Sequence, residues 1–229
     1  MTKIGIAQAL TAFALWSSLA VFFNRVDLPV GIYISLGSIL ALCLVYAGSL
    51  FNRQPVSTRF TWPILGIMAA AAFKGLFWFK ALQIYPVAPA MIIHNLAPLF
   101  AMLFAPLLIR ERPRPHHLFA AITGLLGLTL VLNLPGQATI TLTLGAILSL
   151  GAAIASGFQD VCHRAAKVPA RDQTFVFLLG QALGGTLALF FAVPTQITFT
   201  DLGSIAYFGL FGALLPMTLL SCSFRSLRS

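Results

Sequence analysis

The sequence predicts an all-α polytopic membrane protein with eight transmembrane helices, and two observations support this fold class. Apolar residues make up 59% of the 229 residues and charged residues only 8%, which is too little charge for a water-exposed surface. The apolar residues also form eight runs of about 20 residues, the length that crosses about 30 Å of hydrocarbon as a helix. Because lipid cannot satisfy backbone polar groups, such runs are expected to be helical.

The predicted spans follow one another without an intervening soluble domain. They are Ile4–Phe23, Gly31–Phe51, Trp62–Ile84, Val87–Ile109, His116–Leu134, Leu144–Arg164, Gln173–Ala192 and Leu202–Ser221. The short connections make consecutive helices antiparallel neighbours. The first span follows the basic Lys3 but is longer than the apolar core of about 7–15 residues in a signal peptide. It also leads directly into another span, so we expect it to be retained.

Basic residues predict the orientation of these helices. If the helices alternate, eleven basic residues lie on one side of the membrane and only Arg25 lies on the other. The eleven are Lys3, Arg53, Arg59, Arg110, Arg112, Arg114, Arg164, Lys167, Arg171, Arg225 and Arg228. Since loops rich in Lys and Arg stay in the cytoplasm, both termini are predicted to be cytoplasmic, with the helices in the cell inner (plasma) membrane. The net charge of +9 therefore reflects topology, and no nucleic-acid partner is expected.

An internal repeat relates the beginning of the chain to its second half. At a shift of 140 residues the first and sixth spans share four identities, which pair Gly5, Leu10, Ala12 and Val21 with Gly145, Leu150, Ala152 and Val161. The eighth span resembles the third at a shift of 143 residues. An odd number of helices separates the copies, so the second copy would be inverted in the membrane, as in many transporters. We predict a first repeat of five helices over residues 4–134 and an incomplete second repeat of three helices over residues 144–229.

Several short motifs in a fixed order carry a resemblance to a known family. They are Ala14-Leu15-Trp16-Ser17-Ser18, Phe79-Lys80-Ala81-Leu82, Val87-Ala88-Pro89-Ala90, Leu96-Ala97-Pro98-Leu99-Phe100 and Glu111-Arg112, with a second start at Phe211-Gly212-Ala213-Leu214. This order resembles the EamA-type permeases of the drug/metabolite transporter superfamily. The resemblance implies ten helices in two inverted bundles and alternating-access movement of a small metabolite. This chain differs at Arg110, where the family usually has Gly, and it ends before the Pro-containing helix of the second copy.

Two lysines lie within the third span. Lys74 is near its middle, where an ionisable group is costly and by default marks a pathway or a site. We predict that Lys74 binds or balances a carboxylate in a central cavity between the first, third, fourth and sixth spans. The alternative is that Lys74 snorkels along a water-filled crevice without touching substrate. Lys80 is nearer the outer interface, and snorkelling is the favoured interpretation for it.

The fourth span contains a second candidate binding element. His94 and Asn95 precede Pro98 by four and three residues, and Pro98 cannot donate to the carbonyl of His94, so a kink is expected there. The freed carbonyl, the imidazole and the amide could bind substrate or could only bond to neighbouring helices. Trp16 and Trp78 are predicted to line the same substrate-binding pocket. The alternatives are plain packing for Trp16 and an aromatic belt for Trp78.

The other polar groups are expected to be structural. Asp160 precedes Arg164 by four residues, and an ion pair between them is favoured over a proton-carrying role. The cysteines have no metal-ligand spacing, and no nucleophile–base pair or metal cluster at helical spacing predicts an enzyme. Neither a metal nor a cofactor is expected.

Together these patterns predict a secondary transporter of the inner membrane that moves a small metabolite, such as an amino acid or organic acid, by alternating access. Deep basic residues without a deep acid favour a carboxylate-bearing substrate. The expected partners are this small molecule and the lipid bilayer. The alternative is a truncated, transport-inactive fragment, or a chain that needs a homodimer or another helix-supplying partner.

Overall fold

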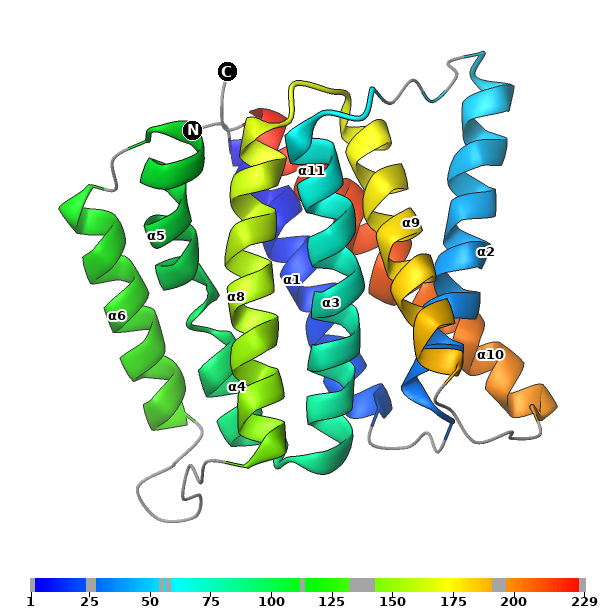
Figure 1. Ribbon diagram of the computed structural model, residues 1–229, viewed down its shortest axis with the longest axis horizontal. Coiled ribbons are helices and arrows are strands. Elements are labelled where there is room, and N and C mark those ends of the chain that lie inside the picture. Colours follow the sequence, from blue (N-terminus) through cyan, green and yellow to red (C-terminus); the bar gives the residue numbers. More distant parts are fainter. Residues whose placement is uncertain are drawn as a thin grey trace.

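The computed structural model describes residues 3–23, 28–53, 56, 59–111, 114–131, 143–190 and 197–226. Arg25, Arg112 and Arg228 of the charge pattern lie outside these residues, as do the ends of the fifth and seventh predicted spans. Every regular element in the described ranges is helical (Figure 1). The elements are α1 (Lys3–Phe23), α2 (Val30–Phe51), α3 (Trp62–Ile84), α4 (Val87–His94), α5 (Ala97–Ile109), α6 (Pro115–Val131), α8 (Leu144–Ala165), α9 (Ala170–Leu189), α10 (Phe199–Tyr207), the π-helix η1 (Phe208–Leu214) and α11 (Leu215–Ser226).

Five helical stretches of the described residues are long and apolar enough to cross a membrane. They are Val30–Phe51, Trp62–Ile84, Val87–Ile109, Leu144–Ala165 and Phe199–Ser223. Large apolar side chains such as Leu107 and Phe190, 77% and 81% exposed, lie on the outside of the bundle. An outer surface of this kind is stable in lipid and not in water, so the chain is a multi-pass helical membrane protein.

The fourth predicted span is broken in the middle, as the sequence indicated. α4 ends at His94, and α5 begins at Ala97 after a turn through Asn95 and Leu96. Pro98 falls in the first turn of α5, where its missing N–H costs little. The amide of Asn95 donates from Nδ2 to the carbonyl of Met91 at 2.7 Å and closes the last turn of α4. The expected kink is therefore confirmed.

The helices pack in pairs around α3 and α9. α3 lies between α8 and α9, α5 packs on the other side of α8, and α1 packs against α11 (Figure 1). α2 contacts both α9 and η1. α6 lies at one edge of the bundle. This arrangement encloses a space between α1, α3, α4, α5 and α8.

Glycines allow two of these crossings to be very close. A Cβ added to Gly180 of α9 would overlap the backbone of Met68 of α3, and one added to Gly209 of η1 would lie 2.6 Å from the carbonyl oxygen of Gly37 of α2. Gly184, four residues after Gly180, lies against Ala72 in the same way. The small residues thus bring helix backbones together, which is the packing expected for a GxxxG spacing.

One end of the bundle collects both ends of the described chain and the connections that follow α2, α5 and α8 (Figure 1). These connections carry much of the basic charge, including Arg53, Arg110 and Lys167. Arg53, Arg110 and Lys167 therefore lie at the same end of the bundle.

Candidate functional site

A cavity of about 530 Å³ lies inside the bundle. Its walls come from α1, α3, α4, α5 and α8, with Phe177, Gln181, Gly212 and Leu220 added from α9, η1 and α11. A volume of this size is within the range of small-molecule sites. All six residues predicted to form a binding site line it, namely Trp16, Lys74, Trp78, His94, Asn95 and Pro98. The structure thus brings them together, and their role in binding remains a prediction.

Lys74 is held beside an aromatic ring, and no acid of the described residues lies within ion-pair distance of it. Its Nζ lies 5.1 Å from the centroid of the Trp16 ring, a cation–π distance. The indole Nε1 of Trp16 in turn donates to the carbonyl of Gly212 at 2.9 Å. Because Gly212 belongs to η1, this bond links α1 to the π-helical segment and fixes the ring under the cation. π-helical segments are often found at functional sites.

His94 and Trp78 form a second aromatic element of the wall. Their rings are stacked with centroids 4.2 Å apart and an interplanar angle of 26°. The ring nitrogen Nδ1 of His94 is buried and has no hydrogen-bond partner among the described residues, and the same is true of the hydroxyl of Ser156. Buried polar atoms without partners are rare in folded proteins. Here both belong to residues that line the cavity, where a ligand or water could satisfy them.

The structure contradicts the predicted ion pair between Asp160 and Arg164. Arg164 Nη1 instead donates to Glu111 Oε2 at 2.7 Å, across the gap between α8 and the end of α5. Asp160 lines the cavity together with Lys74, and the two form no direct ion pair. The expectation that the site has no deep acid is therefore wrong. A signal for this was present, because the polar residues Ser149, Ser156 and Asp160 recur at intervals of seven and four, which places them on one face of a helix.

Lys80 is exposed and is not part of the cavity wall. Gln181 is a cavity residue that sequence reasoning did not select, and its Oε1 accepts a hydrogen bond from the hydroxyl of Ser38 at 3.4 Å. Gln181 lies on α9. Nothing in its local sequence distinguishes it from a glutamine whose side chain only forms hydrogen bonds between helices.

A second group of polar residues lies where α8 turns into α9, and we call it the α8–α9 corner. It consists of Gln159, His163, Arg171, Asp172 and Gln173. His163 Nδ1 pairs with Gln173 Oε1 at 2.9 Å and its Nε2 with Gln159 Nε2 at 3.2 Å. Because Gln173 Nε2 donates to the carbonyls of Ala166 and Val168, its Oε1 must accept, which assigns the ring proton to Nδ1.

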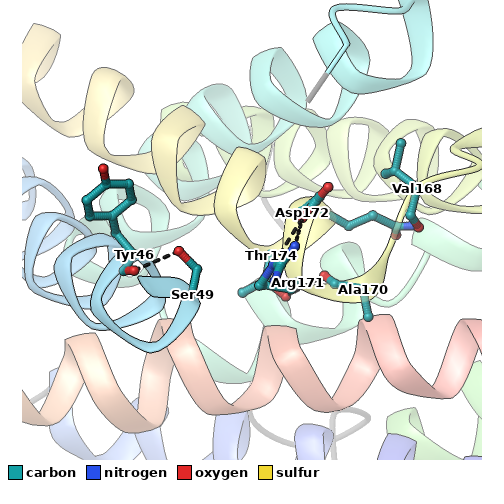
Figure 2. Close-up of polar contacts among 8 residues, drawn as sticks. Tyr46, Ser49, Val168, Ala170, Arg171, Asp172 and Thr174 are labelled. Atoms are coloured by element: carbon teal, nitrogen blue, oxygen red, sulfur yellow. Dashed lines mark hydrogen bonds and ion pairs between the residues drawn. The ribbon is translucent and has the colours of Figure 1, made fainter. Parts of the chain in front are cut away.

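The first turn of α9 completes the corner. Arg171 donates to the carboxylate of Asp172 at 3.2 Å, and Asp172 is only 1% exposed. Figure 2 shows these two residues beside the end of α2, where the hydroxyl of Ser49 donates to the carbonyl of Tyr46 at 2.7 Å. Thr174 of the same turn donates to the carbonyl of Ala170 at 3.0 Å (Figure 2). The corner is thus a structural joint between α8 and α9 that lies beside the end of α2.

No group of three or more His, Cys, Asp or Glu residues in the described ranges could hold a metal ion. Cys43, Cys162 and Cys222 take part in no disulfide bond among the described residues. The chemistry of the site is therefore that of a cation, a carboxyl group, aromatic rings and neutral polar atoms around one cavity.

The chain belongs to the EamA-like transporter family, whose profile matches residues 3–133, more than half of the chain. The aromatic amino acid exporter YddG of Ancylobacter novellus is 32% identical over 127 residues, which make up 54% of this chain and 44% of that exporter. The matched region thus spans less than half of the exporter's length. The crystal structure of another protein superposes with a TM-score of 0.79 over 96% of this chain and 78% of that one, at 23% identity. That likeness establishes the fold.

Proposed function

We propose that this chain is a secondary transporter of the inner membrane that moves a carboxylate-bearing metabolite by alternating access, and that it is not an enzyme. Lys74 carries this proposal. It is a cation inside the bundle that faces a cavity and is held by the ring of Trp16, so a carboxylate in the cavity would give it the partner that it lacks. Trp78, His94, Asn95 and Pro98 would shape the pocket around the rest of the substrate.

The substrate class that we favour is an amino acid or an organic acid. The family membership and the similarity to an aromatic amino acid exporter support it. The stacked Trp78–His94 pair and the Trp16 ring also offer faces on which an aromatic side chain could stack, an interaction typically worth about 0.5–1.5 kcal/mol.

The architecture that we propose is eight transmembrane helices, with an inverted repeat of residues 4–134 and 144–229 and both termini in the cytoplasm. Helix packing supports the repeat. In the repeat, α1, α2 and α3 would correspond to α8, α9 and η1–α11. The packing of α1 against α11 would then be the counterpart of the packing of α8 against α3, and both contacts are present. The crossing of Gly37 with Gly209 likewise corresponds to that of Gly180 with Met68. The basic end of the bundle supports the orientation.

Transport by the purified chain in liposomes tests the proposal. Uptake of radiolabelled phenylalanine, and of an organic acid of similar size, would be compared for the wild type, Lys74→Ala and the matched control Lys80→Ala, which removes an exposed lysine of the same helix. We expect flux from the wild type and the control and background flux from Lys74→Ala. Unchanged flux after loss of Lys74 would contradict its proposed role.

The same measurement addresses the alternative of a transport-inactive fragment. Flux through the chain reconstituted alone would exclude it. Light scattering of the purified protein in detergent would show whether a second copy is needed, since a dimer would then accompany activity.

A further inference from the structure

Asp160 is an acid inside the bundle whose charge no described side chain neutralises directly. The cation one helical turn away, Arg164, is engaged by Glu111 at 2.7 Å. Lys74 lines the same cavity, but it lies over the Trp16 ring and forms no direct ion pair with the carboxylate. An isolated carboxylate in such surroundings is costly, so the group must take either a proton or an external cation.

Whether Asp160 binds a proton or a cation depends on what occupies the cavity, because few other titratable groups surround it. On the helices packed against α8, the titratable side chains that line the cavity are Lys74 of α3 and His94 of α4, whereas α5 carries none; Cys222 of α11 and Cys162 of α8 are not part of the cavity wall. On α8 itself, His163 is bonded into the α8–α9 corner. Among these groups, Lys74 and Asp160 are the oppositely charged pair that lines the cavity.

Resting on the proposed function, we propose that Asp160 exchanges a proton for the ammonium group of an amino acid, so that transport of the amino acid is coupled to proton movement in the opposite direction. Lys74 would hold the substrate carboxylate and Asp160 the ammonium. The unpartnered hydroxyl of Ser156, one turn before Asp160 on α8, lines the same wall and can join either ligand.

The exchange is a simple proton balance. When the substrate enters, the O–H bond of the Asp160 carboxyl breaks and the proton passes to water on the open side of the cavity. The resulting carboxylate accepts hydrogen bonds from the ammonium. When the substrate leaves on the other side, the carboxylate takes a proton from the water there. Proton and ammonium cannot occupy the carboxylate together, and this competition couples the two movements.

The test is proton release on binding, measured with the purified full chain in detergent and weak buffer. Phenylalanine and 3-phenylpropionate share a ring and a carboxylate, but only phenylalanine has an ammonium group. Binding would be followed by tryptophan fluorescence, because two of the three tryptophans line the cavity, and protons by an indicator dye, from mildly acidic to neutral pH. The variants are Asp160→Asn and the matched control Asp201→Asn, whose carboxylate lies outside the cavity in the cap of α10.

We expect phenylalanine to release up to one proton per molecule bound, and 3-phenylpropionate to bind without release. Asp201→Asn should behave like the wild type, and Asp160→Asn should release none. Binding of phenylalanine without proton release anywhere in this pH range would overturn the inference while the proposed function stands. Release that persists in Asp160→Asn would also overturn it. Failure of both compounds to bind would overturn the substrate class and this inference together. If Asp160→Asn does not fold, the comparison of the two compounds on the wild type still decides.

Discussion

The cavity and the α8–α9 corner both contain buried polar side chains, and they differ in where the partners of these groups are. In the corner, His163 is bonded on both ring nitrogens and Asp172 is paired with Arg171. In the cavity, His94 and Ser156 have unpartnered atoms, and Lys74 lies over the Trp16 ring without an ion pair among the described residues. Apart from Gln159 Oε1, which has no partner among the described residues, the polar groups of the corner are satisfied inside the protein, whereas those of the cavity are left for ligand and water.

The two aspartates of these regions make the same point. Asp172 is 1% exposed and accepts from a neighbouring arginine. Asp160 lies in a helix of the same bundle, one turn from an arginine that is engaged elsewhere. Identical side chains thus have a structural role in one region and, as we propose, a substrate-dependent charge in the other. Changes in the corner should act on stability, and changes in the cavity on binding.

His163→Ala should produce the largest loss of stability. It removes the hydrogen-bond partner of Gln173 Oε1 and of Gln159 Nε2 and opens a cavity at a residue that is 1% exposed, which should cost on the order of 3 kcal/mol. Thermal unfolding in detergent would measure this, and phenylalanine affinity of the folded fraction should change less than about twofold. A large loss of affinity with unchanged stability would break the distinction between the two regions.

Lys74→Met should have the opposite effect. Methionine fills a similar volume without a charge, so stability should be equal or higher, because an unpaired charge in the bundle is removed. Binding should weaken at least about tenfold, which corresponds to about 1.4 kcal/mol. The same unfolding and fluorescence measurements apply. A clearly lower melting temperature would mean that Lys74 supports the fold.

Trp16→Phe should give a smaller effect and sharpen the account of the cavity wall. The ring under Lys74 is kept, but the hydrogen bond to Gly212 is lost, at a cost of about 1 kcal/mol. Binding should fall a few-fold, whereas Trp16→Leu, which loses both interactions, should bind markedly worse. Equal affinity of the two variants would show that the ring contributes nothing.

The sequence by itself determined the class of the protein and several features of the site. Hydropathy and length are local properties, and they identified the second, third, fourth, sixth and eighth spans, which the structure shows as helices long and apolar enough to cross a membrane. The break before Pro98 follows from the covalent chemistry of one residue. Lys74 and the aromatic residues could be selected because an ionisable group deep in an apolar run is conspicuous without any knowledge of its neighbours.

Only the tertiary structure decided which polar groups become partners. The spacing of four residues predicted an ion pair between Asp160 and Arg164. The packing of α5 on α8 instead brings Glu111, 53 residues away in the sequence, to Arg164. The same holds for Trp16, whose indole bonds Gly212 across 196 residues. Hydropathy acts residue by residue, whereas a hydrogen bond or ion pair needs two groups whose distance is set by helix packing. The polar face of α8 is visible in the sequence, but only the fold shows that Arg164 is engaged by Glu111 and that Asp160 lines the cavity.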